Sequence, residues 1–310
     1  MHNYVDPAAL EELKKADNLP APSGVRLNIM RLCQAEDDVS LSDLISQIQA
    51  DPVLAGRLIK IANGAGVNMG RQIVAVNIDV ILMIGLDAVR QLTLAISLTS
   101  NRRNENFPGF DYDAFWSRSV AMACAGQALA EYYGAVPPTE MFASGLLANI
   151  GRLGLTSTGS GEYVKLLQQS LPSAELARQE KAIFGYNHLD LAAAMMQDWN
   201  VPRLFCEAVW HHEAPEESGV DVGSRQRKLI DLLNLSAAIA DYCCASDADR
   251  MKAFLALLKC AERLERSQED LVAVCDRIGR YWAEWGGIVH IQTRRLPSTR
   301  QMLTLSVAEQ

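Results

Sequence analysis

Apolar residues recur every three or four positions along most of this chain, and no stretch alternates apolar and polar residues over a sustained length. The first pattern is typical of amphipathic helices, and the second would indicate strands. Asp6-Pro7 and Asp51-Pro52 each combine a capping side chain with a proline at a helix start. Hydrophobic residues make up 49% of the chain and charged residues 21%, which is the balance of a folded protein. The sequence therefore predicts an all-α, multi-helical fold.

Caps, prolines and glycines divide this helical pattern into segments. The run 75–84 is apolar on nearly every side, so we expect it at the centre of a core. The polar run 101–110 contains Pro108 and Gly109 and is the clearest internal linker. Further helices are expected at 8–16, from Pro22-Ser23 onward, at 41–50, 53–63, 86–100, 111–133, 139–155, 161–170, 173–184, 188–198, 202–212, 224–246, 249–260 and 267–285.

Charge and composition exclude several classes of protein. The net charge of -8 disfavours nucleic-acid binding, because an acidic surface repels phosphate backbones. Arg102-Arg103 and Arg294-Arg295 are the best basic clusters, and we interpret both as solvated surface charges. No apolar run reaches the length of a membrane span, and no signal peptide is visible, so no membrane partner is expected.

The cysteines indicate the redox compartment. Their number is odd, no CxxC motif occurs, and most lie among apolar residues at helical spacing. This pattern is typical of buried free thiols in a reducing cytoplasm. The sequence therefore predicts a cytoplasmic location, with free thiols at Cys33, Cys124, Cys206, Cys243, Cys244, Cys260 and Cys275.

Three of the five histidines invite a functional interpretation. His211 and His212 end the segment FCEAVWHHE, and His188 lies near the start of another helix. Such histidines can face solvent or pack in a core, or they can bind a transition metal or a phosphate. Neighbouring residues on a helix point about 100° apart, so only one of His211 and His212 can easily share a site with His188. The spacing alone leaves both interpretations open.

The order of segments resembles the HDOD domain, a divergent, non-catalytic branch of the HD metal-dependent phosphohydrolase superfamily found in bacterial signalling proteins. The resemblance spans about Leu19 to Asp241, most of the chain. Its more specific marks are a DPxL segment ending in Ala-Asn and a W-x-V-P segment followed by HH. The matching stretches are NLPAPSGVRLNIM, ISQIQADPVLAGRLIKIANGA, VILMIGLDAVRQLTLAIS, AFWSRSVAMACAGQALA, FASGLLANIGRLGL, EKAIFGYNHLDLAAAMMQDWNVPRLFCEAVWHHE and LSAAIADYC.

The resemblance implies a degenerate metal site. Where catalytic relatives have a first His, this chain has Arg118. Their adjacent His-Asp pair is matched by Ala148 and Asn149, and the Lys or Arg that ends this motif by Arg152. The distal Asp of the superfamily is matched by Asp241.

The chemistry of these replacements argues against hydrolysis. Ala148 has no donor atom, and Asn149 offers only a neutral carbonyl oxygen to a hard cation. The guanidinium of Arg118 cannot lose its proton and cannot ligate a metal. We therefore expect a pseudoenzyme without catalytic residues, cofactor or bound metal. Arg118 would pair with Asp241 and supply the positive charge that the metal gives in catalytic relatives; the alternative is an Arg118 exposed on a helix face.

His188 and either His211 or His212 match additional ligands of the cyclic-di-guanylate phosphodiesterase branch of the superfamily. These residues are candidates for a residual ligand or metal site, because three His can hold zinc with water as the fourth ligand. A single divalent metal at these histidines is the alternative to a chain without metal.

The resemblance also implies a domain organisation. Residues 18–245 would form one HDOD domain, with an N-terminal lobe at 18–100 and an HD-like core at 107–245. Residues 1–17 and 246–310 would be helical extensions. We expect one unit, because the linker is too short to imply independent domains.

The predicted function is that of a non-enzymatic signal-transduction adaptor. It would bind signalling proteins in trans or a nucleotide-like ligand. Arg57 and Asn63 are plausible polar residues of a cleft between the lobes. The alternative is a metal-dependent phosphohydrolase with a reduced ligand set, acting on a nucleotide or a cyclic dinucleotide.

Overall fold

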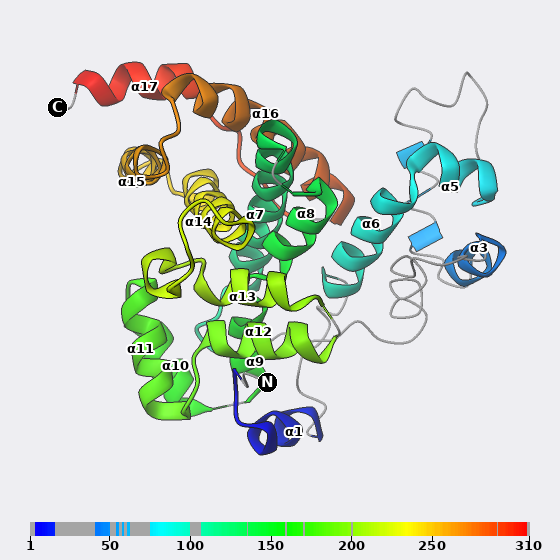
Figure 1. Cartoon of the computed structure of the whole chain (residues 1–310), viewed down its shortest axis with the longest axis horizontal. Coiled ribbons are helices and arrows are strands. Elements are labelled where there is room, and N and C mark those ends of the chain that lie inside the picture. Colours follow the sequence, from blue (N-terminus) through cyan, green and yellow to red (C-terminus); the bar gives the residue numbers. More distant parts are fainter. Residues whose placement is uncertain are drawn as a thin grey trace. The chain divides into compact units, whose positions relative to one another are not determined.

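The computed structural model describes a helical protein (Figure 1). Within the described residues there is no strand, so the predicted all-α class is confirmed. None of the described helices is both long and apolar enough to cross a membrane. The described residues are 4–15, 41–49, 54–55, 58, 61–62, 75–99, 107–134, 136–158, 160–169, 171–199, 201–289 and 291–308.

The chain forms two compact units, Ala21–Asn104 and the combination of Met1–Pro20 with Glu105–Gln310. Helix α1 (Pro7–Lys15) belongs to the larger unit, where Lys14 pairs with Asp198 at 2.7 Å. Helix α1 therefore contacts the larger unit through at least this ion pair.

The smaller unit contains α3 (Leu41–Gln49), α5 (Ile78–Ile84) and α6 (Leu86–Thr99). Gly85, with φ of 88°, separates α5 from α6 as the sequence predicts. The expected central position of the 75–84 run is only partly correct. Val80 and Ile81 are buried, but Leu82 is 65% exposed. The helix expected after Pro22-Ser23 lies outside the described residues.

The larger unit is built around α7, and its elements follow one another in the order predicted from residue 111 onward (Figure 1). They are α7 (Tyr112–Tyr133), α8 (Pro138–Leu147), α9 (Ile150–Ser157), α10 (Gly161–Gln168), α11 (Ser173–Phe184), α12 (His188–Asp198), α13 (Arg203–His211), the 3-10 helix η2 (Pro215–Ser218), α14 (Arg225–Cys244), α15 (Arg250–Arg263), α16 (Gln268–Val289) and α17 (Thr299–Ala308).

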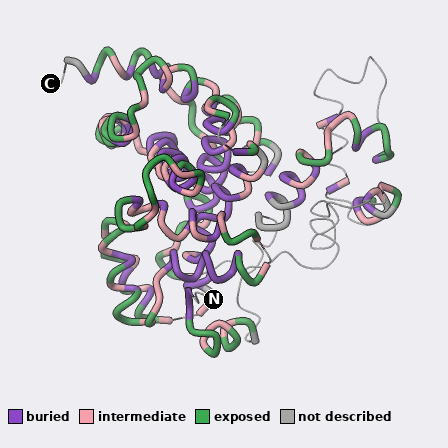
Figure 2. Tube along the Cα trace, viewed as in Figure 1, coloured by how far each residue is buried: buried purple, intermediate pink, exposed green. Residues whose placement is uncertain are grey.

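Helix α7 is buried along most of its length (Figure 2) because α8, α14 and α16 pack on different sides of it. Small side chains let the backbones of α7 and α8 approach closely. A Cβ on Gly126 would lie 2.8 Å from the Met141 carbonyl oxygen, and one on Gly145 would lie 2.6 Å from that of Met122. The α7–α8 contact therefore requires glycine at both positions.

The predicted helices differ from the structure at two places. The segment 139–155 is two helices, because the chain turns at Ala148-Asn149 between α8 and α9. No proline or positive-φ residue marks this turn, and it allows α9 to pack on α12. Helix α17 was not predicted, although Ser298 and Gln301 form reciprocal side-chain to backbone hydrogen bonds of 3.3 and 3.2 Å at its start. This is the capping-box pattern of a helix N-terminus.

The six cysteines in the described residues are all free. Five are buried and Cys244 is half-buried, as the apolar setting of these residues in the sequence predicts. Cys33 lies outside the described residues.

The close approach of α9 to α12 gives the first testable prediction. A Cβ on Gly151 would lie 2.0 Å from the His188 carbonyl oxygen, so Gly151→Ala forces two backbones apart. We expect this change to lower the free energy of unfolding by about 3 kcal/mol, measured by urea denaturation. At Gly161 an added Cβ meets nothing within 4 Å, so the control Gly161→Ala should change stability by less than about 0.5 kcal/mol. Equal effects of the two changes would contradict the prediction.

Candidate functional site

The residues predicted to mark a degenerate metal site belong to one packed region of the larger unit. Helix α7 packs on α14, α14 packs on α13, and α13 packs on α12, which also contacts α9. Arg118 on α7 interacts electrostatically with Asp241 on α14 and with Glu213 after α13. His212 interacts with Arg118, Glu213 and His188. These side chains therefore lie within electrostatic range of one another.

Arg118 pairs with Asp241, as expected from the sequence. Its Nε donates to Asp241 Oδ1 at 2.7 Å. The Arg118 side chain is 26% exposed and that of Asp241 is 56% exposed. Burial disfavours the charged guanidinium, but the charge and hydrogen bond of Asp241 outweigh it and raise the pKa of Arg118 above its ordinary value. A permanent cation therefore occupies the side of Asp241 that faces α7.

Ala148 and Asn149 lie at the turn between α8 and α9 and are both buried. Asn149 places its Nδ2 3.6 Å from the sulfur of Met122. Its Oδ1 is buried and has no hydrogen-bond partner among the described residues. These two positions therefore supply one neutral oxygen and no charge.

His188 is the centre of a buried polar network. Its side chain is fully buried, and its Nδ1 lies 2.6 Å from Oε2 of Glu180, which is also fully buried. The same carboxylate oxygen accepts the backbone N–H of His188 at 2.9 Å. On the other side of the ring, Nε2 lies 3.4 Å from Glu213 Oε1 and 3.4 Å from an Arg152 nitrogen. The imidazole therefore bridges two carboxylates, one on α11 and one after α13.

Arg152 and Ser173 complete this network. Arg152 donates to the Ser173 hydroxyl, and that hydroxyl donates to Glu213 Oε1 at 2.8 Å. The Arg152 guanidinium also lies 3.6 Å from Glu213. Burial acts to raise the pKa of Glu213, but the hydrogen bond and charge of His188, with the charges of His212 and Arg152, hold it well below its usual range. Glu213 is therefore a carboxylate anchored by α9, α11 and α12.

The other two histidines have different surroundings. His212 is fully buried, and its Nδ1 lies 2.6 Å from the Val209 carbonyl oxygen. Burial lowers the pKa of His212 below its ordinary value. His211 is half-buried, with its ring 4.5 Å from that of Trp210. Within the described residues, no group of three or more His, Cys, Asp or Glu side chains is arranged to hold a metal ion.

The site contains two acidic residues that the sequence analysis did not single out. Glu180 lies on the buried face of α11 with Leu176 and Ala177, so a carboxylate on an apolar stripe was the available signal. Glu213 directly follows His212 and gave no separate signal. Arg57 and Asn63, predicted to line a cleft between the lobes, lie outside the described residues.

Residues 19–215 match the family model described as the HDOD domain. The chain belongs to the HDOD family. The match covers more than half of the chain and includes every network residue from Arg152 to Glu213. Asp241 and the whole of α15, α16 and α17 lie beyond it.

Solved structures share the HDOD fold. An HDOD domain protein with unknown function from Geobacter sulfurreducens is 18% identical, with 90% of this chain and 96% of that chain covered and a TM-score of 0.66. A "putative phosphohydrolase" from Shewanella amazonensis SB2B is 20% identical, with 97% and 95% covered and a TM-score of 0.61. A "putative signal transduction protein" from Marinobacter aquaeolei VT8 is 18% identical, with 93% and 67% covered and a TM-score of 0.63. No curated protein matches the sequence.

The Glu213 carboxylate gives a prediction with a pH dependence. Glu213→Gln removes the charge that faces Arg152 and His188, so we expect the free energy of unfolding at pH 7 to fall by roughly 3 kcal/mol. The folded-state pKa is depressed, so this contribution is fully present above pH 4.5, the ordinary value, and is lost as the pH falls below it. Urea denaturation of wild type and variant across this range should show their difference shrinking.

The matched control for this experiment is Glu217→Gln, since Glu217 is exposed on η2. It should change stability by less than about 0.5 kcal/mol at either pH. A wild-type to Glu213→Gln difference that stays constant from pH 7 down to pH 3 would contradict the assigned charge interaction.

The Arg118–Asp241 pair can be measured with a double-mutant cycle. Because both side chains are partly exposed, we expect a coupling free energy of about 0.5–1 kcal/mol between Arg118→Ala and Asp241→Ala. The control pair is Lys165–Glu162 on α10. Its nitrogen–oxygen distance is also 2.7 Å, but the Lys165 side chain is 68% exposed. Its coupling should be about 0.3 kcal/mol. A coupling at Arg118–Asp241 that is smaller than that of the control would show that the pair is incidental.

Proposed function

We propose that this HDOD protein is a non-enzymatic adaptor of bacterial signal transduction, acting in the cytoplasm by binding a signalling protein in trans or a nucleotide-like ligand. The single observation behind the proposal is the 2.7 Å hydrogen bond between Arg118 and Asp241. In this interpretation Arg118, Ala148, Asn149, Arg152 and Asp241 are the remnants of an HD metal site.

The residues at these positions do not fit a divalent metal. A metal bound to Asp241 would have to displace the Arg118 guanidinium or lie beside a permanent positive charge. Asn149 offers a neutral oxygen and Ala148 offers none, so neither compensates for that charge. We therefore derive no hydrolytic step from this region.

The buried network supports a structural role for residues that resemble ligands. His188 Nδ1 is engaged by Glu180 and the Glu213 carboxylate is engaged by Ser173, so forming a ligand set would cost existing hydrogen bonds. These contacts fix α9, α11, α12 and the end of α13 relative to one another. A rigid helical scaffold of this kind suits a protein that presents a binding surface.

The alternative is a phosphohydrolase with a reduced ligand set, and the observation in its favour is the grouping of His188 with two carboxylates. The two functions differ in one measurable property, which is turnover of a phosphodiester.

The proposal predicts no turnover when the wild-type protein is incubated with manganese and either bis-p-nitrophenyl phosphate or cyclic di-guanylate. Elemental analysis of the dialysed protein should then show less than about 0.1 equivalents of metal. The variant Arg118→His with Ala148→His and Asn149→Asp restores the ligand types of catalytic relatives, and should retain more manganese than wild type. Wild-type turnover that Asp241→Asn or His188→Ala abolishes would overturn the adaptor function.

A further inference from the structure

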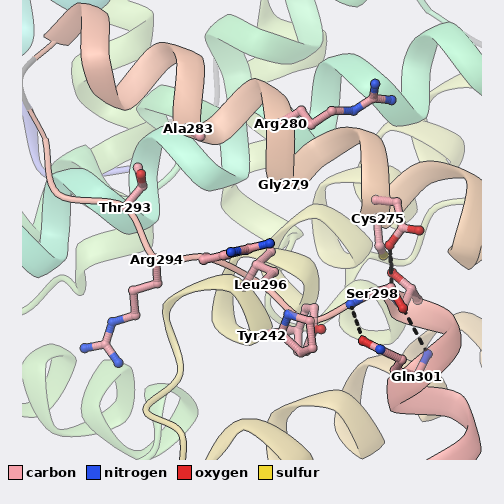
Figure 3. Close-up of a pocket in the computed structure, with 14 residues that line it drawn as sticks. Tyr242, Cys275, Gly279, Arg280, Ala283, Thr293, Arg294, Leu296, Ser298 and Gln301 are labelled. Atoms are coloured by element: carbon pink, nitrogen blue, oxygen red, sulfur yellow. Dashed lines mark hydrogen bonds between the residues drawn. The ribbon is translucent and has the colours of Figure 1, made fainter.

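The C-terminal part of the chain contains a pocket outside the region matched by the HDOD family. Its walls are formed by α16, the segment 293–299 before and at the start of α17, and Tyr242 of α14 (Figure 3). Its volume is about 750 Å³, within the range of small-molecule sites. Every lining residue lies at position 242 or beyond, and the family match ends at residue 215.

Positive charge is concentrated around this pocket. Its lining includes Arg280, Arg294 and Arg295 but only one acidic residue, Asp276. The chain as a whole has a net charge of -8, so such a local excess of arginine is unusual for this protein. Figure 3 shows Arg280 on α16 and Arg294 on the facing segment, with their guanidinium groups directed away from each other.

These charges are largely uncompensated. No ion pair involves Arg280 or Arg295 among the described residues, and the Arg294 side chain donates a hydrogen bond to the Ala245 carbonyl oxygen at 3.3 Å. The Asp276 carboxylate is engaged elsewhere, since its Oδ1 accepts both the backbone N–H and the hydroxyl of Thr299, at 2.8 and 2.7 Å. Asp276 therefore anchors the start of α17 through one of its carboxylate oxygens.

Tyr242 provides an independent indication of a ligand. Its side chain lines the pocket and is only 1% exposed, yet its hydroxyl has no hydrogen-bond partner in the described part of the chain. A buried hydroxyl without a partner is costly and uncommon in folded proteins. Burial raises the pKa of Tyr242, so the phenol keeps its proton and can donate a hydrogen bond.

We propose that this pocket binds a small organic phosphate. Arginine forms paired, charge-assisted hydrogen bonds to phosphate oxygens, and the Tyr242 hydroxyl supplies a donor at the buried side. Ala283, Leu296 and Pro297 offer apolar surface to the organic part of the ligand. The lining arginines belong to two walls, α16 and the segment 293–299, so a ligand with more than one phosphoryl group suits the pocket better than a single phosphate. This site goes beyond the adaptor function and does not depend on the Arg118 region.

The test uses the full chain and isothermal titration calorimetry with three probes in EDTA, namely ATP, inorganic pyrophosphate and adenosine. We expect ATP to bind, pyrophosphate to bind more weakly, and adenosine not to bind. Affinity for ATP should fall as the salt concentration rises, because the contacts are ionic. Binding of adenosine as tight as that of ATP, or no binding of either phosphate probe, would overturn the proposal.

Variants locate the binding in this pocket. Arg295→Ala should weaken ATP binding about tenfold, and the same change combined with Arg280→Ala should weaken it further. Arg300→Ala is the matched control, because Arg300 is exposed in the first turn of α17 but does not line the pocket. Tyr242→Phe removes only the hydroxyl and should also weaken binding while thermal unfolding stays cooperative.

Two results would count against the pocket even if ATP binds. One is an Arg300→Ala effect equal to that of Arg295→Ala, which would indicate general charge attraction. The other is unchanged affinity in both Arg295→Ala and Tyr242→Phe. Because EDTA removes divalent metal, these outcomes are separate from the turnover experiment that tests the adaptor function.

Discussion

The larger unit depends on the burial of α7 along most of its length. Its small residues allow α8 to approach at backbone distance, and α14 and α16 cover other faces of the helix. A helix enclosed in this way has almost no freedom to shift, because a packed interior transmits any displacement to its neighbours. Arg118 lies in the second turn of this helix, and the position of its backbone is consequently fixed by the core.

This fixed position explains why the Arg118–Asp241 contact is informative despite its partial exposure. A salt bridge at a surface normally contributes little stability. Here the helices α7 and α14 are already packed together, so the two side chains lose little further freedom when they pair. The pair therefore balances the charge of Asp241 and is expected to contribute little to fold stability.

The His188 network is buried, whereas the Arg118–Asp241 pair is partly exposed. Glu180 and His188 are fully buried and Glu213 is 14% exposed, so the polar groups cannot exchange their partners for water. Removing one member leaves others unsatisfied in a medium of low dielectric constant, which is where polar networks are most costly to disturb. His188, a candidate metal ligand in the sequence, thus helps to hold helical segments together through Glu180 and Glu213. In the C-terminal pocket, by contrast, the arginines and the Tyr242 hydroxyl have few hydrogen-bond or ion-pair partners among the described residues.

The sequence by itself determined the helical class and most helix limits from residue 111 onward, because caps, prolines and apolar periodicity act locally. The resemblance to the HDOD domain, together with the residue types at Arg118, Ala148 and Asn149, also led to the prediction that ligand chemistry is lost at these positions. Only the tertiary structure decided the turn at Ala148-Asn149, the burial of Glu180, and the grouping of Arg294 and Arg295 with Tyr242. Each of these depends on contacts between segments distant in the chain, and such contacts leave no periodic trace in the sequence.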